Sequence, residues 1–562
     1  MLNIRVSERQ ISRQKKGIRI SWKRLLLFSF LFTIIALVFI EKGNFSAALK
    51  YVLFTKKNIV VYDTYTFAFD DSVPSDIRDM VVDGLGELKL GDVNRFEFVE
   101  KKSDILLSKN QEEGMIELFS KNFIPVAHLY SLEGDVSKDS LKKFNLFMLD
   151  SKYEKYLEGQ YSVNIEISES KEQLVEKLAE SDKNIALVEF DDLDVDMKIL
   201  DVDSRNFLDD ENGSIPISFF AKLKSSEDLF IVDVVKKNVG STDSKFNREK
   251  LVKVNMSGVV AISRGLALKM DSLKSTTYPA DEIGEFLANA DLTHVSNEVS
   301  FVPGCKVYSG MRFCSRPEYI DVLKKSGVDI VELTGNHNND FGSKYSKESI
   351  KIYTDLGMRY FGGGLDDVDA SKILYEEVKG TKIAFMGYNY YDTMLKTLAL
   401  AGDERSGANS FSEEKMQSDI ETARKNADIV IVDFQFQECY SYPSSDVIFP
   451  ICYKPLSSPD QKGVFKKAID MGADIVVGTQ AHQPQTFELY KDGVIFYGLG
   501  NLFFDQSIWI GTRQGLVLSH YFYEGRHIQT QVVPIYMEKD LKVRLATESQ
   551  GDLLMKLLKN AR

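Results

Sequence analysis

The chain has 562 residues, more than one hydrophobic core usually serves, because single cores stop growing at about 250–300 residues. Hydrophobic residues make up 44% of the sequence and charged residues 27%, values that exclude a disordered or low-complexity chain. The net charge is −13, although the first 24 residues carry eight basic side chains and one acidic side chain. The acidic remainder excludes a general affinity for nucleic acid and other polyanions.

An uninterrupted apolar run at residues 25–40 follows the basic segment 1–24 and is closed by Glu41 and Lys42. As a helix it covers roughly 24 Å, which spans the ~30 Å hydrocarbon core with help from its basic flank. We predict a single transmembrane anchor, with the basic segment in the cytoplasm and the rest of the chain outside. A cleaved signal peptide is the alternative, since small residues follow at 46–48, but Glu41 and Lys42 intervene.

Predicted strands and helices alternate along residues 56–245. Strand-like runs lie at 58–62, 95–99, 104–108, 123–127 and 186–190, and helical spacing at 75–90 and 171–181. Such alternation is typical of an α/β domain. The order of the segments 185–203 and 213–223 resembles the two-lobed fold of periplasmic solute-binding proteins, which implies a binding module but names no ligand residue. A spacer domain with the same periodicity is the alternative.

The segment 250–540 contains strand-like apolar runs that end in polar residues. The runs lie at 252–256, 328–333, 429–434, 473–477 and 495–499. Functional sites of α/β folds lie at such strand ends, and Asn, His, Glu and Gln side chains suit a divalent cation. Three of the six histidines, His294, His337 and His482, fall in these motifs. A lone histidine is more often a hydrogen-bonded loop residue, but the pair His337 and His482 favours a site.

Four motifs in this segment follow a known pattern in its usual order. They are S-N-E at 296–298, G-N-H-N-N-D-F-G at 335–342, G-T-Q-A-H-Q-P-Q at 478–485, and the stretch 497–504. They resemble the N-L-E, N-N-H-x-x-D-x-G, G-H-H-P-H and Y-S-L-G-N-F-x-F segments of the CapA family. The resemblance implies a four-layer α/β/β/α sandwich related to calcineurin-like metallophosphatases. It also implies a role in making or exporting a capsular polymer such as poly-γ-glutamate.

The resemblance also implies roles for individual residues. Glu298, Asn336 and His482 would hold one divalent ion (Mn, Zn or Mg), with His337 as general acid and Asp340 orienting it. A helix cap is the alternative role for Asp340. Further contacts with substrate or metal are expected from Asn297, Arg264, Gln435, Glu438, Gln480 and Asn501, and for Arg264 a surface or structural pairing is the alternative.

Three positions depart from the family pattern. Val259 stands where the pattern has an acidic ligand, Gln435 where it has a histidine, and Gln480 replaces the first histidine of G-H-H-P-H. An amide oxygen is a weaker ligand than a carboxylate and cannot act as a base near neutral pH. These departures compromise a two-metal site and favour a pocket that is kept for binding rather than for hydrolysis.

The four cysteines are Cys305, Cys314, Cys439 and Cys452, and all lie outside the membrane in the predicted topology. Their even number and close spacings suit an oxidising compartment. We favour two local bridges, Cys305–Cys314 and Cys439–Cys452. Zinc ligation is an alternative that no C-x-x-C pair supports, and free buried thiols are another.

The sequence therefore predicts a single-pass protein of the cell membrane with its N-terminus in the cytoplasm. Its expected partners are the membrane and a capsular polymer or its synthase subunits, with no nucleic acid. A metal-dependent envelope hydrolase of phosphoesters or amides and a non-catalytic ligand-binding or sensing protein are the alternatives. The predicted segments are a basic tail at 1–24, the anchor at 25–40, a solute-binding-protein-like domain at 56–245, a CapA-like domain at 250–540 and a C-terminal helix at 541–562.

Overall fold

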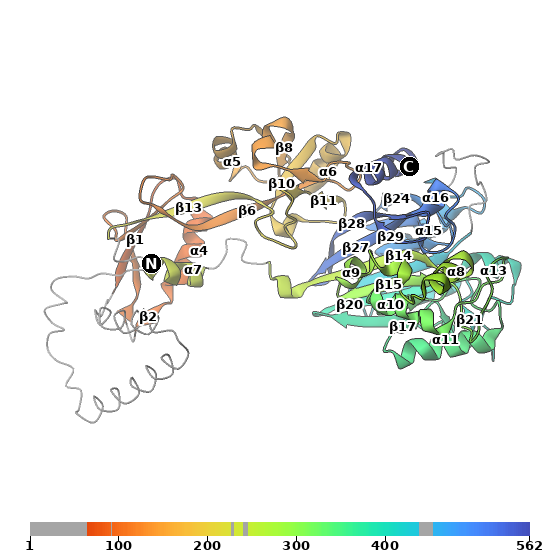
Figure 1. Ribbon diagram of the computed structural model, residues 1–562. Helices are drawn as coiled ribbons and strands as arrows, with labels where there is room; N and C mark the ends of the chain where they lie inside the picture. Colours follow the sequence, from red (N-terminus) through yellow and green to blue (C-terminus); the bar gives the residue numbers. More distant parts are fainter. Residues whose placement is uncertain (1–63, 91–92, 226–229, 240–245, 438–452) are drawn as a thin grey trace, which may run out of the picture. The chain divides into compact units, whose positions relative to one another are not determined.

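Two compact units make up the part of the chain that the structure, a computed structural model, describes (Figure 1). The described residues are 64–90, 93–225, 230–239, 246–437 and 453–562. The predicted anchor at 25–40 lies outside them. Among the described helices, none has the length and apolar character needed to cross a membrane.

The two units do not follow the predicted domain limits of 56–245 and 250–540. The first contains the described residues up to Phe123, Asp150–Val163 and Ser214–Phe246, and the second contains Ile124–Leu149, Asn164–Gly213 and Asn247–Arg562. The chain passes between the units more than once. At the first passage, after Phe123, the long strand β6 (Ile116–His128) continues through the boundary.

The first unit is built on an α/β sheet. Parallel strands β4 (Phe96–Phe98), β1 (Tyr65–Phe69) and β5 (Ile105–Ser108) are followed by β13 (Ile215–Leu223), which runs antiparallel to β5 and to β6. The helices are α4 (Ser75–Gly86), α5 (Glu154–Tyr161) and α7 (Phe230–Val239). Helix α4 buries Ile77, Val81 and Leu85 on one face. Gly84 lets α7 approach α4, since a Cβ there would lie 2.7 Å from the carbonyl oxygen of Asn238.

A smaller sheet opens the second unit. Its order is β6-β10-β8-β9, with β10 (Asn184–Val188), β8 (Asn145–Met148) and β9 (Ile165–Ile167), while β11 (Met197–Ile199) also pairs with β6. Helix α6 (Lys171–Glu180) begins after Ser170, whose side chain caps it, and buries Leu174 and Leu178. The strands predicted at 104–108, 123–127 and 186–190 and the helix predicted at 171–181 are therefore confirmed as β5, β6, β10 and α6.

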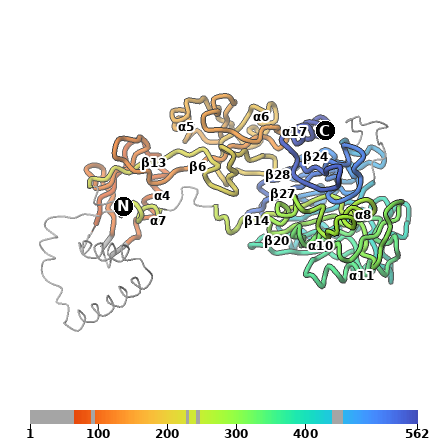
Figure 2. The backbone as a smooth tube through the Cα atoms, in the orientation of Figure 1, coloured from red at the N-terminus to blue at the C-terminus, as the bar shows by residue number. Residues whose placement is uncertain are grey.

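Two large sheets form the rest of the second unit. The first has the order β17-β16-β15-β14-β27-β28-β29, from β17 (Arg359–Phe361), β16 (Ile330–Glu332), β15 (Leu292–Asn297), β14 (Leu251–Val260), β27 (Gln514–Tyr523), β28 (Arg526–Met537) and β29 (Val543–Leu545), and β26 (Asn501–Phe503) also pairs with β14. The second has the order β19-β20-β22-β23-β25-β24, from β19 (Leu374–Val378), β20 (Thr381–Asn389), β22 (Ile429–Gln435), β23 (Ile475–Thr479), β25 (Gly493–Leu499) and β24 (Pro484–Tyr490). Figure 2 shows β14 beside β27, which comes from near the end of the chain.

The two large sheets pack face to face between two layers of helices. Ile431 of β22 lies in the core between the sheets with Val254 of β14, whereas its neighbour Val432 packs against the outer helices. Helices α8 (Arg264–Leu273), α10 (Ile320–Lys325) and α11 (Ser343–Asp355) cover the first sheet, and α14 (Glu413–Arg424) and α15 (Gln461–Asp470) cover the second. The predicted mixed α/β fold is confirmed, and its layers run helix, sheet, sheet, helix.

The C-terminal region at 541–562 contains a strand as well as the predicted helix. Strand β29 pairs with β28, with Val543 opposite Met537, and α17 (Glu548–Asn560) follows β29. Leu554 and Leu558 of α17 join the core between the sheets, so the helix packs on the domain as its spacing predicts. The remaining short elements are α9 (Gly284–Ala288), α12 (Asp367–Ala370), α13 (Tyr390–Leu395), α16 (Ile510–Arg513), β2 (Lys89–Leu90), β3 (Val93–Asn94), β7 (Asp135–Val136), β12 (Asp201–Val202), β18 (Gly363–Gly364) and β21 (Gly407–Ala408).

Candidate functional site

The polar residues that follow the parallel strands of both large sheets meet at one edge. Asn389, at the end of β20, donates from Nδ2 to the carbonyl oxygen of Thr334, which follows β16, at 2.8 Å. The ends of strands from the two sheets are therefore in contact. His337 and His482 lie close enough for the charge of His482 to lower the pKa of His337. The structure thus brings together the two histidines that the sequence predicted as a pair.

Asp340 holds His337 in place. Nδ1 of His337 lies 2.7 Å from Oδ2 of Asp340, and the side chains are 11% and 17% exposed. Burial alone lowers the pKa of His337, but the hydrogen bond with Asp340 and the negative charge of Glu298 raise it above its ordinary value. His337 therefore keeps its proton to a higher pH than a free histidine does, as a general acid needs. Helix α11 has Gly342 as its N-cap, so Asp340 orients His337 rather than capping that helix.

Asn501 orients the second histidine, His482. Asn501 donates from Nδ2 to the carbonyl oxygen of Thr512 at 3.0 Å, so its Oδ1, 2.8 Å from Nδ1 of His482, is the acceptor. With this assignment, Nδ1 of His482 donates to Oδ1 of Asn501. His482 and Gln480 have φ angles of 52° and 79°, a conformation that side chains disfavour and that is common at functional sites.

The predicted single-ion set is Glu298, Asn336 and His482, and all three follow strand ends. Glu298 is 1% exposed, and it fits because Gly335 lacks a side chain, since a Cβ there would lie 2.4 Å from Cβ of Glu298. Among the described residues, no hydrogen-bond partner is found for Oδ1 of Asn336, a buried atom. The set stays a prediction.

Gln435 and Gln480 bond to each other. Nε2 of Gln435 donates to Oε1 of Gln480 at 2.8 Å, and both side chains are buried. Val259, where the resemblance expects an acid, is 1% exposed and cannot serve as a ligand. Nowhere in the described part of the chain do three or more His, Cys, Asp or Glu side chains form a group that could hold a metal. The described residues therefore do not fit a two-metal centre.

Two other residues that were predicted to contact substrate or metal instead bind side chains of the protein. Asn297 donates from Nδ2 to the hydroxyl of Tyr353 in α11 at 2.7 Å, so it faces the helix layer rather than the site. Arg264 forms an ion pair with Asp505. Glu438 lies outside the described residues.

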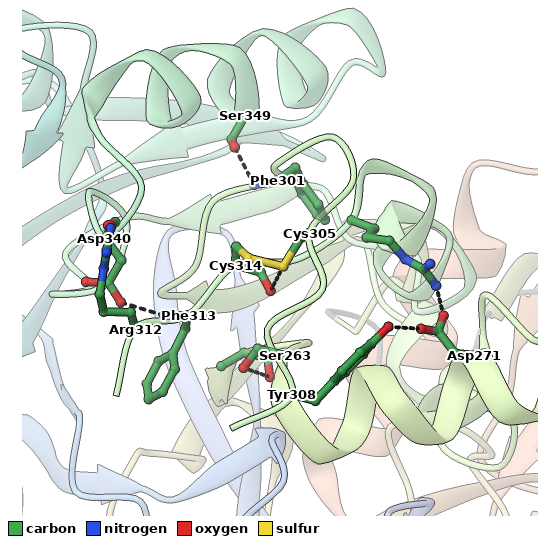
Figure 3. The surroundings of a disulfide bond; sticks show 12 residues. Ser263, Asp271, Phe301, Cys305, Tyr308, Arg312, Phe313, Cys314, Asp340 and Ser349 are labelled. Atoms are coloured by element: carbon green, nitrogen blue, oxygen red, sulfur yellow. Dashed lines mark hydrogen bonds and ion pairs between the residues drawn. A yellow bond between two sulfur atoms is a disulfide. The ribbon is translucent and has the colours of Figure 1, made fainter. Parts of the chain in front are cut away.

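The predicted disulfide Cys305–Cys314 is present, with its Cα atoms 6.1 Å apart. Figure 3 shows the loop that it closes, from which Phe313 reaches Asp340. The backbone N–H of Phe313 donates to Oδ2 of Asp340 at 2.7 Å, and its ring centroid lies 4.0 Å from that of His337. The bridged loop therefore packs directly on the His337–Asp340 pair. Cys439 and Cys452 lie outside the described residues.

A second polar cluster lies deeper between the sheets. Nε2 of His294 on β15 is 3.0 Å from Oδ2 of Asp433 on β22, and both side chains are fully buried. Glu332 of β16 is also buried, and this burial, together with the charge of Asp433, raises the pKa of its carboxyl. Burial likewise raises the pKa of Asp433, while His294 opposes the rise. Sequence reasoning missed both acids, although each interrupts an apolar strand-like run.

Comparison with known proteins identifies the segment that contains this site. Residues 253–506 match the family described as bacterial capsule synthesis protein PGA_cap. This segment belongs to that family. It includes His337, Asp340, His482 and Asn501, so the two oriented histidines lie within the CapA-like domain.

Two curated relatives carry the CapA name. Capsule biosynthesis protein CapA of Bacillus anthracis is 30% identical over 238 residues, 42% of this chain and 54% of that protein. PGA biosynthesis protein CapA of Bacillus subtilis (strain 168) is 29% identical over 219 residues, 39% of this chain and 53% of that protein. The chain thus spans about half the length of the curated relatives that it matches.

Solved structures give weaker likenesses. A putative 5'-nucleotidase from Staphylococcus aureus is 13% identical with a TM-score of 0.30, covering 55% of this chain and 58% of that one. A 5'-nucleotidase precursor from Thermus thermophilus is 11% identical with a TM-score of 0.31 and the same coverage. At such scores the likeness supports no statement about fold or activity.

Replacing Asp340 by Asn should lower the pKa of His337, because burial is then opposed by less negative charge. A folded-state pKa above the ordinary 6.5 stabilises the fold below that pH, and the stabilisation is lost as pH rises through the raised value. We expect Asp340→Asn to cost about 1.5 kcal/mol of unfolding free energy near pH 5 and less near pH 9. NMR titration of the histidines and urea unfolding measure both effects. The exposed Asp355→Asn is the control, and an unchanged His337 pKa contradicts the proposed pairing.

Replacing Glu332 by Gln should stabilise the protein more at alkaline than at acidic pH. The raised pKa means that wild-type stability is full below about 4.5 and falls as pH rises through the folded value, a loss that the neutral amide avoids. Between about pH 5 and pH 8 the variant should gain roughly 1–3 kcal/mol relative to wild type in urea unfolding. Glu348→Gln on the surface of α11 should show no such trend. If the difference in unfolding free energy between Glu332→Gln and wild type does not change with pH, the pKa of Glu332 is not raised in the folded protein.

The predicted set of Glu298, Asn336 and His482 implies one bound divalent ion per chain. Mn²⁺ or Zn²⁺ should therefore raise the melting temperature of the full chain, and elemental analysis should find one ion that disappears in His482→Ala. An unchanged melting temperature together with no bound ion would overturn the set.

Proposed function

We propose that the chain is a membrane-anchored, extracytoplasmic CapA-like protein. It acts in the synthesis or export of a capsular polymer such as poly-γ-glutamate, beside the subunits of the polymer synthase. The family match over 253–506 supports the link to capsule synthesis, and the two CapA relatives support the polymer class.

The observation that carries the proposal is the meeting of two oriented histidines at the strand ends. His337, with its raised pKa and its partner Asp340, donates a proton to an oxygen of the polymer or its precursor. His482, held by Asn501 through Nδ1, lies at the same strand ends and contacts the same group. Glu298 helps to keep His337 protonated through its charge.

The proposed location rests on two features of the chain. The apolar run at 25–40 is long enough for a single span, and the basic segment 1–24 orients it. The bridge Cys305–Cys314 suits an oxidising compartment.

A non-catalytic ligand-binding role is the second candidate. The hydrogen bond between Gln435 and Gln480 favours it, because two side chains at positions expected to hold a metal are instead committed to each other. Such a site recognises a ligand without hydrolysing it.

Deleting the gene in a capsule-forming strain that carries it should reduce cell-associated polymer, and the wild-type gene should restore it. His337→Gln and His482→Gln should each restore about 100-fold less than wild type, the usual contribution of one general acid or base. Lys344→Gln, whose side chain is 74% exposed, is the control and should restore it fully. Immunoblots establish equal amounts of each protein.

Different outcomes separate the two candidates. An unchanged capsule in the deletion strain overturns the capsule role. Full restoration by both histidine variants overturns the acid–base chemistry and favours the binding role. Protease added to intact cells should cut the chain beyond Lys42, and protection there would contradict the proposed orientation.

A further inference from the structure

A cavity of about 600 Å³ opens beside His482, at the same edge as the candidate site. The bridged loop supplies one wall of it and the segment after β26 supplies the other. Most of its lining is aromatic or aliphatic, from Tyr308, Met311, Phe313, Phe504, Ile508 and Trp509. Figure 3 shows Tyr308 and Phe313 on the loop that Cys305 and Cys314 close. This volume is ordinary for a small-molecule pocket.

The charged residues in the lining neutralise each other. Within the described lining, Arg264 and Asp505 alone carry full charges, and Nε of Arg264 donates to Oδ1 of Asp505 at 3.0 Å. The guanidinium carbon lies 4.6 Å and 4.8 Å from the ring centroids of Phe313 and Phe504. Arg264 is therefore committed to the wall, and this lining offers no excess positive charge to an anion.

Apolar side chains at the mouth of the cavity remain exposed to solvent. Ile508 is 77% exposed, Met311 68% and Tyr308 36%. Exposed apolar groups that gather around a cavity favour an apolar ligand, because its binding removes their surface from water.

The inner end of the cavity is polar. His482 lines it, and its Nδ1 lies 2.8 Å from Oδ1 of Asn501.

We propose that this cavity binds the hydrocarbon portion of an amphiphile whose polar head is uncharged. The assignment rests on the proposed function in taking this edge as the place where the chain meets its substrate. The described lining has no excess basic side chains that would bind an anionic polymer. Its apolar side chains instead suit an apolar carrier or tail.

Tryptophan fluorescence tests the proposal on the full chain. The chain has two tryptophans, Trp22 and Trp509, so Trp22→Phe leaves a single reporter in the cavity. This protein, held in tryptophan-free polymer nanodiscs, is titrated with n-butyl, n-pentyl and n-hexyl glucoside. Affinity should rise about fourfold for each added methylene, because each buries further apolar surface. n-Hexyl phosphate should bind more weakly than n-hexyl glucoside.

Matched surface variants supply the control. Ile508→Ser should weaken n-hexyl glucoside binding by about tenfold, the effect of losing one aliphatic contact. Val368→Ser, at a side chain that is 71% exposed on α12, should leave it unchanged. Affinity that is independent of chain length, or equal for the phosphate and the glucoside, overturns the proposal. Binding that persists while the capsule assay fails overturns the proposed function alone, and the reverse result overturns the cavity assignment alone.

Discussion

Burial of both faces of the central strands is the constraint on which the rest of this structure depends. The central strands of the two large sheets meet the opposite sheet on one side and helices on the other. Polar side chains on such strands must pair inside the core or emerge at the carboxyl ends. His294 and Asp433 take the first course, and His337 and His482 take the second. The site lies at this edge because the layers close off the faces.

The sequence predicted the position of the site better than the direction of its side chains. Apolar runs followed by polar residues mark strand ends whatever the partner strand, so the motifs around His337 and His482 could be recognised. Asn297 and Glu298 are neighbours, and adjacent residues of an extended chain point to opposite faces. The motif assigned both to the site, but Asn297 faces Tyr353 in the helix layer. A motif alone does not show which of two adjacent side chains points toward the site.

Pairings between distant residues could not be predicted either. Arg264 and Asp505 are 241 positions apart, and Gln435 and Gln480 are 45 apart, yet each pair meets in the fold. These contacts show that Arg264 pairs within the wall of the cavity and that the two amides hydrogen-bond to each other. The division of the chain into units was hidden for a related reason, because periodicity reveals a strand such as β6 but not which core each half joins.

The shape of the site depends on the disulfide between Cys305 and Cys314, and therefore on the conditions in which that bond forms. The loop that it closes carries Phe313, whose backbone and ring both contact the His337–Asp340 pair. Such a bond forms and persists where thiols are oxidised, and reducing compartments prevent it. In the proposed extracytoplasmic location this bond would form only after export. Closure of the loop on the His337–Asp340 pair would then be a late step in the maturation of the site.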